Sequence, residues 1–145
     1  MIAAPIPAYD TERLAALHSL GLLDTPQEER FDRITRLLTL VMRVPMAFLS
    51  LVDADRQWFK SSCGLSTPET PRAVSFCGHA ILSDEAMVVP DATEDERFRG
   101  DGNGAPQGPA VHDGHVMRSL GRGEMVDVEL NGLHGAPAAR RDRAS

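Results

Sequence analysis

The tripeptide Cys77-Gly78-His79 holds the pair of side chains in this sequence that is best suited to covalent chemistry. A thiol next to an imidazole at a helix start can have a lowered pKa, and its thiolate is then a nucleophile. A thiol-dependent reductase or peroxidase that uses Cys77 is therefore one hypothesis. We favour a buried thiol, with His79 bonded to the backbone, because free cysteine usually packs as a small hydrophobic residue.

The other candidate ligands and acid–base groups lack the spacing that their chemistry requires. Structural zinc needs four ligands with paired spacing, and Cys63, Cys77 and His79 supply no such set. Asp53 and Asp55 lie in a tight turn, where aspartate is favoured for its local hydrogen bonds. We therefore predict no metal site and no catalytic residues, and the sequence leaves any cofactor unknown.

Composition excludes several classes of protein. The 145 residues suit one domain, and 15 basic against 21 acidic residues give a net charge of −6. Nucleic-acid binding needs a basic face, so we expect no nucleic-acid partner. No apolar run approaches the roughly 20 residues that span a bilayer, so we expect no membrane partner. Two cysteines make no disulfide framework, which favours a cytoplasmic protein.

The chain divides into two unlike pieces after Phe98. Residues 1–98 hold every aromatic residue and every isoleucine, whereas residues 99–145 hold none of either and most of the 12 glycines. A segment without such residues has little from which to build a core. We predict a tail at residues 1–9, an organised domain at residues 10–98, and a divergent, poorly ordered Gly/Arg-rich segment at residues 99–145.

Hydrophobic spacing predicts two helices near the N-terminus. The first covers residues 9–20, with its leucines on one side. The second begins at a capping box over residues 25–28 and ends near Arg43, because Pro45 disfavours helix at the residue before it. One stripe of this second helix is expected in the core: Phe31, Ile34, Leu38 and Val41.

Short strands and turns follow the second helix. Residues 46–52 and 57–63 read as a hairpin. Arg56 and Lys60 could meet an anionic ligand, but we favour a solvated hairpin end for them. We then expect a loop at residues 64–75, a short helix at 76–82, a strand at 87–89 and a helix starting at 93–96. Residues 125–130 alternate like one more strand. This order predicts the α+β class, with a sheet covered by helices.

Several stretches of residues 10–98 together carry a recognisable pattern. They are RLAAL (13–17), LLDTP (22–26), ERFDRIT (29–35), LSLVDADRQWFK (49–60), TPR (70–72), SFCGHAI (75–81), VVPDAT (88–93) and RF (97–98). In this order they resemble the GAF family of small-molecule sensor domains, in the N-terminal type found ahead of bacterial histidine kinases and diguanylate cyclases.

The resemblance implies a central antiparallel sheet flanked by helices, with a pocket between the sheet and the short helix that crosses one face. The pattern stops after Phe98, which implies a sheet that is incomplete at its C-terminal end. Candidates for the pocket lie on the hairpin and the short helix, with ordinary core packing as the alternative: Phe48, Ser50, Trp58, Phe59, Phe76, Cys77 and His79.

The resemblance also implies a function. We expect a sensory or regulatory module of signal transduction, as in two-component systems, that binds an unknown small molecule or a partner and modulates an output domain outside this chain. The expected partners are a second copy, as a homodimer, or a neighbouring kinase or cyclase module. A thiol-dependent enzyme using Cys77 and a ligand-free dimerisation module are the alternatives.

Overall fold

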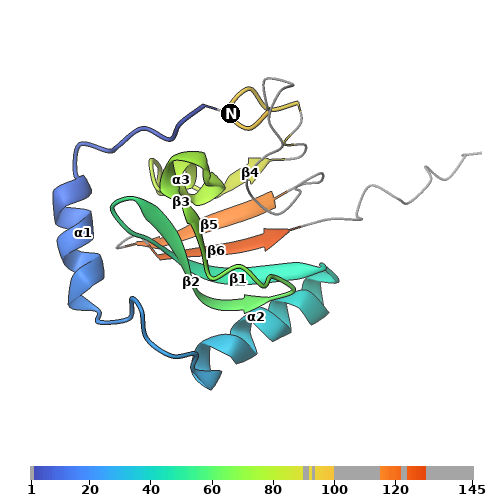
Figure 1. The fold of residues 1–145 in the computed structure, drawn as a ribbon. Helices are drawn as coiled ribbons and strands as arrows, with labels where there is room; N and C mark the ends of the chain where they lie inside the picture. Colours follow the sequence, from blue (N-terminus) through green and yellow to red (C-terminus); the bar gives the residue numbers. More distant parts are fainter. Residues whose placement is uncertain (1, 90–91, 93, 100–114, 122–123, 130–145) are drawn as a thin grey trace, which may run out of the picture.

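One six-stranded sheet with helices on both faces organises the chain (Figure 1). In this computed structural model the described residues are 2–89, 92, 94–99, 115–121 and 124–129. The strands are β1 (Met46–Val52), β2 (Arg56–Cys63), β3 (Glu69–Pro71), β4 (Met87–Val89), β5 (His115–Gly121) and β6 (Glu124–Glu129). The helices are α1 (Asp10–Ser19), α2 (Glu29–Met42), the 3-10 turn η1 (Arg72–Val74) and α3 (Phe76–Ala80).

The strands follow the order β3-β2-β1-β6-β5-β4, and every neighbouring pair is antiparallel. The α+β class with a helix-flanked antiparallel sheet is therefore confirmed. The strand expected near the C-terminus is present as β6, and β5 is a strand that the sequence did not indicate. Both lie beyond residue 98, where we expected the organised domain to end. No helix among the described residues is long and apolar enough to cross a membrane.

A bulge shapes the hairpin of β1 and β2. The turn between the strands is closed by Asp53, whose carboxylate accepts the Ala54 N–H at 2.9 Å. Further along, Leu49 pairs with Ser61 and the next residue of β1 pairs with Phe59, so Lys60 is an extra residue in β2. An extra residue of this kind redirects its own side chain and bends the strand.

The bulge turns Lys60 inward, so the expectation that it lies at a solvated hairpin end is wrong. Its side chain is fully buried, and Nζ lies 2.7 Å from Thr25 Oγ1, from the Pro26 carbonyl and from Glu28 Oε2. These contacts also explain why no capping box forms. Thr25 and Glu28 bind Lys60, and α2 begins only at Glu29.

The other boundaries of helices and strands agree only in part with those predicted from the sequence. Arg43 takes a left-handed φ of 53° and ends α2 as predicted. The expected loop at residues 64–75 is partly wrong, since it contains β3 and η1. No helix begins at Glu94, because residues 94–99 form turns in which the Asp95 carboxylate accepts the Arg97 N–H. Thr93 lies outside the described residues.

Buried polar side chains set the rotation of α2 on the sheet. Thr35 is buried, and its hydroxyl lies 2.9 Å from Ser61 Oγ, which donates to Asp32 Oδ1 at 2.6 Å. These bonds fix the rotation of α2 so that Ile34 and Val41 face solvent. The expected core stripe is therefore wrong for these two residues. Its other two members are half-buried: Phe31 and Leu38.

A buried ionic cluster ties α1 to the hairpin turn and to η1. The Asp10 carboxylate accepts two hydrogen bonds from Arg72, at 2.9 and 3.0 Å, and one from Arg13 Nε at 2.8 Å. Arg13 Nη1 also donates to the Val52 carbonyl, and Arg72 reaches the carbonyls of the turn after β1. Arg13 Nη2 and Arg72 Nε are buried without a hydrogen-bond partner among the described residues.

We expect Asp10→Asn to lower the free energy of unfolding by about 3 kcal/mol or more, because it leaves two buried guanidinium groups without a counter-charge. Urea unfolding at neutral pH measures this loss. Asp24→Asn is the matched control, since Asp24 pairs with Arg56 at the surface, and we expect little change. Equal losses in the two variants would contradict the structural role of the cluster.

The difference in the free energy of unfolding between wild type and Asp10→Asn should depend on pH. Burial alone would raise the pKa of Asp10, but hydrogen bonds from Arg72 and Arg13 outweigh it, so the pKa lies below its usual value. A carboxyl of this kind stabilises the fold fully above its unfolded pKa, and the stabilisation is lost as pH falls through the folded pKa. The gap between wild type and Asp10→Asn should therefore narrow below about pH 4.

Candidate functional site

The sheet face that lies against α3 presents two polar side chains to one sulfur. Ser50 Oγ donates to Cys77 Sγ at 3.4 Å, and Gln57 Nε2 donates to it at 3.1 Å. Ser50 and Cys77 are fully buried, and the sulfur belongs to the cluster that includes Val52 and Val89. This position favours a thiol packed in the core over one that meets a solute.

The aromatic residues of the hairpin divide between the two faces of the sheet. Phe48 and Phe59 meet edge to face, with ring centroids 4.9 Å apart, and the register puts Phe59 opposite Ser50. Trp58 pairs with Leu51, so strand alternation places it on the face opposite α3. The predicted pocket set is therefore split, with Trp58 apart from the others on the hairpin.

A second aromatic group lies at α3 and holds the N-terminal stretch. The Phe76 and Phe98 ring centroids are 4.2 Å apart, and His79 meets Phe98 edge-on at 5.1 Å. His79 Nε2 lies 3.0 Å from the Ile2 carbonyl, and the Ile2 N–H donates to the Arg97 carbonyl at 2.8 Å. The stretch expected as a tail is thus bonded to the domain here, and again where the Ala4 N–H donates to the Ala73 carbonyl and the Tyr9 hydroxyl donates to the Ile81 carbonyl.

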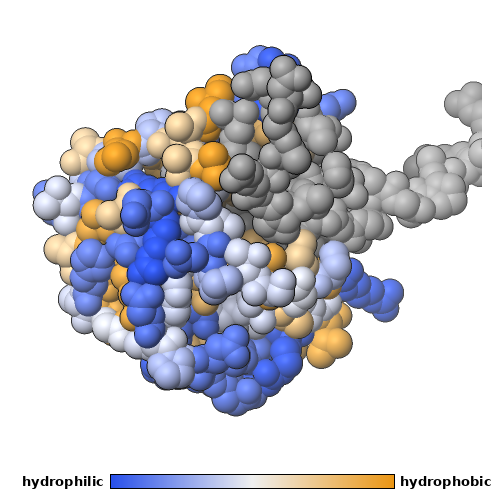
Figure 2. All heavy atoms as spheres, in the orientation of Figure 1, coloured by the Kyte–Doolittle hydropathy of each residue, from blue (hydrophilic) through white to orange (hydrophobic). Residues whose placement is uncertain are grey.

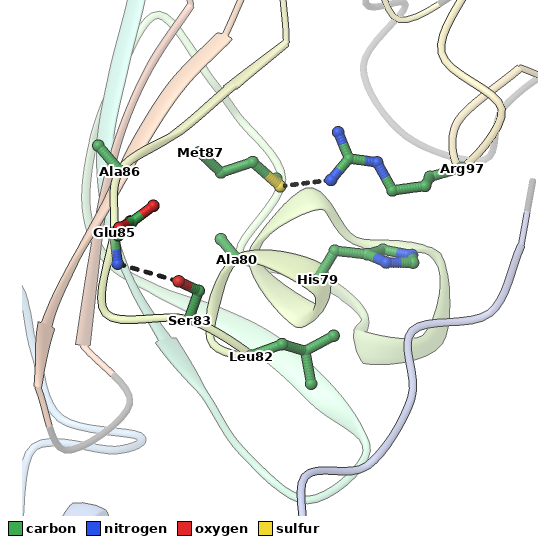
Figure 3. A pocket seen from close by; sticks show the side chains of 8 residues that line it. All are labelled: His79, Ala80, Leu82, Ser83, Glu85, Ala86, Met87 and Arg97. Atoms are coloured by element: carbon green, nitrogen blue, oxygen red, sulfur yellow. Dashed lines mark hydrogen bonds between the residues drawn. The ribbon is translucent and has the colours of Figure 1, made fainter.

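A hollow of about 350 Å³ opens beside α3 (Figure 3). Its walls are α3, the segment 82–86, β4 and the turn that carries Arg97. Four apolar residues contribute to the lining: Ala80, Leu82, Ala86 and Met87. Four polar residues complete it: His79, Ser83, Glu85 and Arg97. Of the seven pocket residues that the sequence predicted, the described lining contains His79.

Arg97 is the cation of this hollow. Asp95 accepts hydrogen bonds from its Nε at 2.9 Å and its Nη2 at 2.6 Å, and this pairing lowers the pKa of Asp95 and raises that of Arg97. The third nitrogen, Nη1, donates to Met87 Sδ at 3.2 Å. A thioether is a weak acceptor, so a carboxylate in the hollow would be a better partner for this N–H.

Sequence reasoning missed Arg97 and Met87 as members of a site. Arg97 stood in a stretch that resembles the family, but a single arginine has no spacing pattern that marks it as a ligand-binding residue. Met87 was predicted only as a residue of the strand at 87–89. The turn at residues 94–99 brings the two together, and no local sequence pattern predicts that contact.

The two cysteines lie on opposite faces of the sheet. Cys63 Sγ is 3.8 Å from Thr39 Oγ1 of α2, whereas Cys77 lies under α3. They cannot form a disulfide with each other without a change of fold. A redox cycle in which one resolves the other is therefore not supported. No three His, Cys, Asp or Glu side chains lie close enough to hold a metal within the part of the chain that the structure describes.

These features describe a one-sheet α+β domain with helices on both faces and a small hollow beside the short helix. The family model of the GAF domain matches residues 26–121, and the chain belongs to this family. The chain is also 41% identical over 99 residues to a cyclic di-GMP phosphodiesterase of Pseudomonas aeruginosa. That match covers 68% of this chain but only 17% of the phosphodiesterase.

Solved structures agree on the fold. A free methionine-R-sulfoxide reductase from Neisseria meningitidis superposes with a TM-score of 0.55 at 19% identity, covering 89% of this chain and 80% of the reductase. The GAF domain of a phosphoenolpyruvate-protein phosphotransferase from Acinetobacter gives 0.54 at 14% identity, covering 86% and 78%. Identities this low show a shared fold and carry no activity over to this chain.

We expect a thiol reagent such as DTNB to label Cys63 in the folded protein and to reach Cys77 only after unfolding, because Cys63 is half-buried and Cys77 is fully buried. Absorbance of the released thiolate measures both reactions. Cys77→Ser should react like wild type, and Cys63→Ser should be almost unreactive until denaturant is added. Fast labelling of Cys77 in folded Cys63→Ser would restore the thiol-enzyme hypothesis.

Proposed function

We propose that this chain is a cytoplasmic sensory module of bacterial signal transduction, which binds a small molecule and modulates an output domain. The hollow beside α3 is the observation that carries this proposal. Its volume of about 350 Å³ suits a small metabolite. Its lining divides evenly between apolar and polar side chains, so it offers a ligand both apolar contact and hydrogen-bonding groups.

The lining indicates the class of ligand. Arg97 Nη1 donates to the Met87 sulfur, which is a weak acceptor. A ligand carboxylate would accept a stronger hydrogen bond from this nitrogen. Leu82 and Met87 offer apolar surface to the rest of the molecule. Glu85 in the lining, and Asp95 behind Arg97, would repel a ligand with several negative charges. We therefore propose a small monocarboxylate with an apolar body.

The contacts around the hollow supply a route to the rest of the module. The N-terminal stretch is bonded to His79 and to the Arg97 backbone, and it continues directly into α1. A ligand that draws the Arg97 side chain away from Met87 would shift the population between two arrangements of this stretch. The displacement of this N-terminal stretch, ahead of the fixed α1, is then the signal that an adjoining domain receives.

The relative in Pseudomonas aeruginosa suggests the kind of output. Its name is that of a cyclic di-GMP phosphodiesterase, and this chain spans about one-sixth of it. We propose that the module regulates an enzyme of cyclic di-GMP turnover or a histidine kinase. Catalysis by the module itself is not part of this proposal, because Cys77 is enclosed between Ser50 and Gln57.

We expect a panel of small monocarboxylates to contain compounds that raise the melting temperature of the purified protein. A ligand at one hundred times its Kd should add about 2.7 kcal/mol to the free energy of unfolding. Differential scanning fluorimetry measures the shift, and mass spectrometry of denatured protein identifies any compound that copurifies.

Arg97→Gln should abolish this shift, since the amide carries no charge for the carboxylate. Arg99→Gln is the matched control, because Arg99 is an exposed arginine two residues away and is not in the lining. The proposal fails if no compound stabilises wild type, or if Arg97→Gln responds as strongly as Arg99→Gln.

A further inference from the structure

We propose that Met87 is a modification site, at which hydrogen peroxide converts the thioether to a sulfoxide that binds Arg97 and closes the hollow to a ligand. Met87 lines the hollow from β4, and its side chain is half-buried. Figure 3 shows its sulfur directed at the Arg97 guanidinium. The oxidation site is argued from this contact alone, whereas its effect on a ligand rests on the proposed function.

Hydrogen peroxide can reach the Met87 sulfur from the hollow. In Figure 2 the surface over α3 mixes hydrophobic and hydrophilic side chains, so small polar solutes can meet this margin of the sheet. The volume of about 350 Å³ leaves room for a peroxide molecule beside the sulfur. Hydrogen peroxide carries no charge, so the carboxylates of Glu85 and Asp95 do not repel it.

Arg97 directs the peroxide to one side of the sulfur. Its Nη1 donates to Met87 Sδ at 3.2 Å, and a thioether is a weak acceptor. A peroxide oxygen accepts this hydrogen bond more strongly, which frees the sulfur lone pair on the same side. The lone pair attacks the peroxide oxygen, the O–O bond breaks, and the departing hydroxide takes the proton left on the sulfur-bound oxygen and leaves as water. The sulfur loses two electrons to the peroxide, and Arg97 keeps all its protons.

The sulfoxide oxygen has a hydrogen-bond donor where it forms. Met87 packs in part against the buried cluster that includes Val52 and Val89, and an oxygen turned into that cluster would be a polar group without a partner. An oxygen turned to the hollow accepts a hydrogen bond from Arg97, whose Nε and Nη2 are held by Asp95. Because a sulfoxide is more polar than a thioether, the oxidised side chain binds Arg97 more strongly and keeps its place in the fold.

The other methionines whose side chains the structure describes lack this arrangement. Met42 is 39% exposed at the end of α2, where a sulfoxide oxygen meets water on any side. Met46 is half-buried at the start of β1, and its sulfur accepts no hydrogen bond from the described residues. Met42 is therefore the matched comparison, because it is more exposed than Met87 and has no guanidinium bonded to its sulfur.

Oxidation of Met87 competes with the proposed ligand for one N–H group. The ligand carboxylate is proposed to accept a hydrogen bond from Arg97 Nη1, which the sulfoxide oxygen occupies in the oxidised protein. The ligand must then displace a strong acceptor instead of a weak one, so its dissociation constant should rise about tenfold or more. Peroxide would in this way suppress the response of the module.

The stereochemistry of the sulfoxide tests the site without any ligand. The full chain is treated with limiting hydrogen peroxide and digested, and the peptides are incubated with methionine sulfoxide reductases, each of which reduces one epimer. Mass spectrometry measures the sulfoxide that remains. At Met87 one epimer should exceed the other by about fivefold, which is the effect of a single hydrogen bond. At Met42 the two should form in similar amounts.

Two arginine variants test the role of the guanidinium. Arg97→Leu should bring the epimer ratio at Met87 close to the ratio at Met42. Arg99→Leu is the matched control, since Arg99 is exposed and lies outside the lining, and it should be oxidised like wild type. Circular dichroism establishes that each variant is folded. The proposal is wrong if wild-type Met87 stays intact while Met42 is fully oxidised, if its two epimers form equally, or if folded Arg97→Leu keeps the wild-type ratio.

Met87→Gln tests the effect on the ligand, because glutamine supplies a carbonyl oxygen in a side chain of similar length. A monocarboxylate that stabilises wild type should bind this variant roughly tenfold more weakly, and Met42→Gln should bind it like wild type. Equal binding by the two variants would overturn the competition. If no monocarboxylate stabilises wild type, the proposed function fails, while the epimer ratio at Met87 still decides the oxidation site.

Discussion

Two buried guanidinium groups share the carboxylate of Asp10, and the elements around the hollow depend on that contact. One carboxylate neutralises only one of the two positive charges. Backbone carbonyls at the end of β1 and in the turn after it accept further hydrogen bonds from the two arginines. Buried charges are tolerated only with such partners, so α1, the hairpin turn and η1 must keep one relative position. Because η1 runs into α3, the cluster also sets where α3 begins.

The local geometry then directs the side chains of α3. Ser75 Oγ donates to the Arg72 carbonyl and accepts the Gly78 N–H, which starts the helix. A Cβ at Gly78 would lie 2.6 Å from that carbonyl, so the close approach of α3 to η1 requires glycine. With the helix held this near, Cys77 points to the sheet and His79 to the N-terminal stretch. The tripeptide that looks chemical in the sequence therefore separates into a core residue and a wall of the hollow.

The sequence predicted best where the pattern is local. The hairpin of β1 and β2 follows from two apolar runs and a turn, and α3 follows from a capping serine. Long-range contacts explain the predictions of local structure that were wrong. Thr25 reads as a helix cap but binds Lys60 across the fold, and periodicity revealed the apolar side of α2 without showing that Thr35 and Ser61 turn it outward. The seven pocket candidates came from the hairpin and α3. Arg97 joins the hollow only because the turn at residues 94–99 brings it against Met87 of β4.

The two faces of the sheet bind their helices through different interactions. The α3 face is closed by apolar packing around Val52 and Cys77, and the hollow opens at its margin. On the α2 face, polar bonds set the rotation of the helix, which leaves Ile34 and Val41 on its outer side. Lys60 fastens the segment between α1 and α2 to the hairpin, so movement at α1 is not free to pass into α2. A ligand at the hollow would therefore act on the N-terminal stretch, which contacts His79 and the Arg97 backbone, while α1, α2 and the hairpin keep their relative positions.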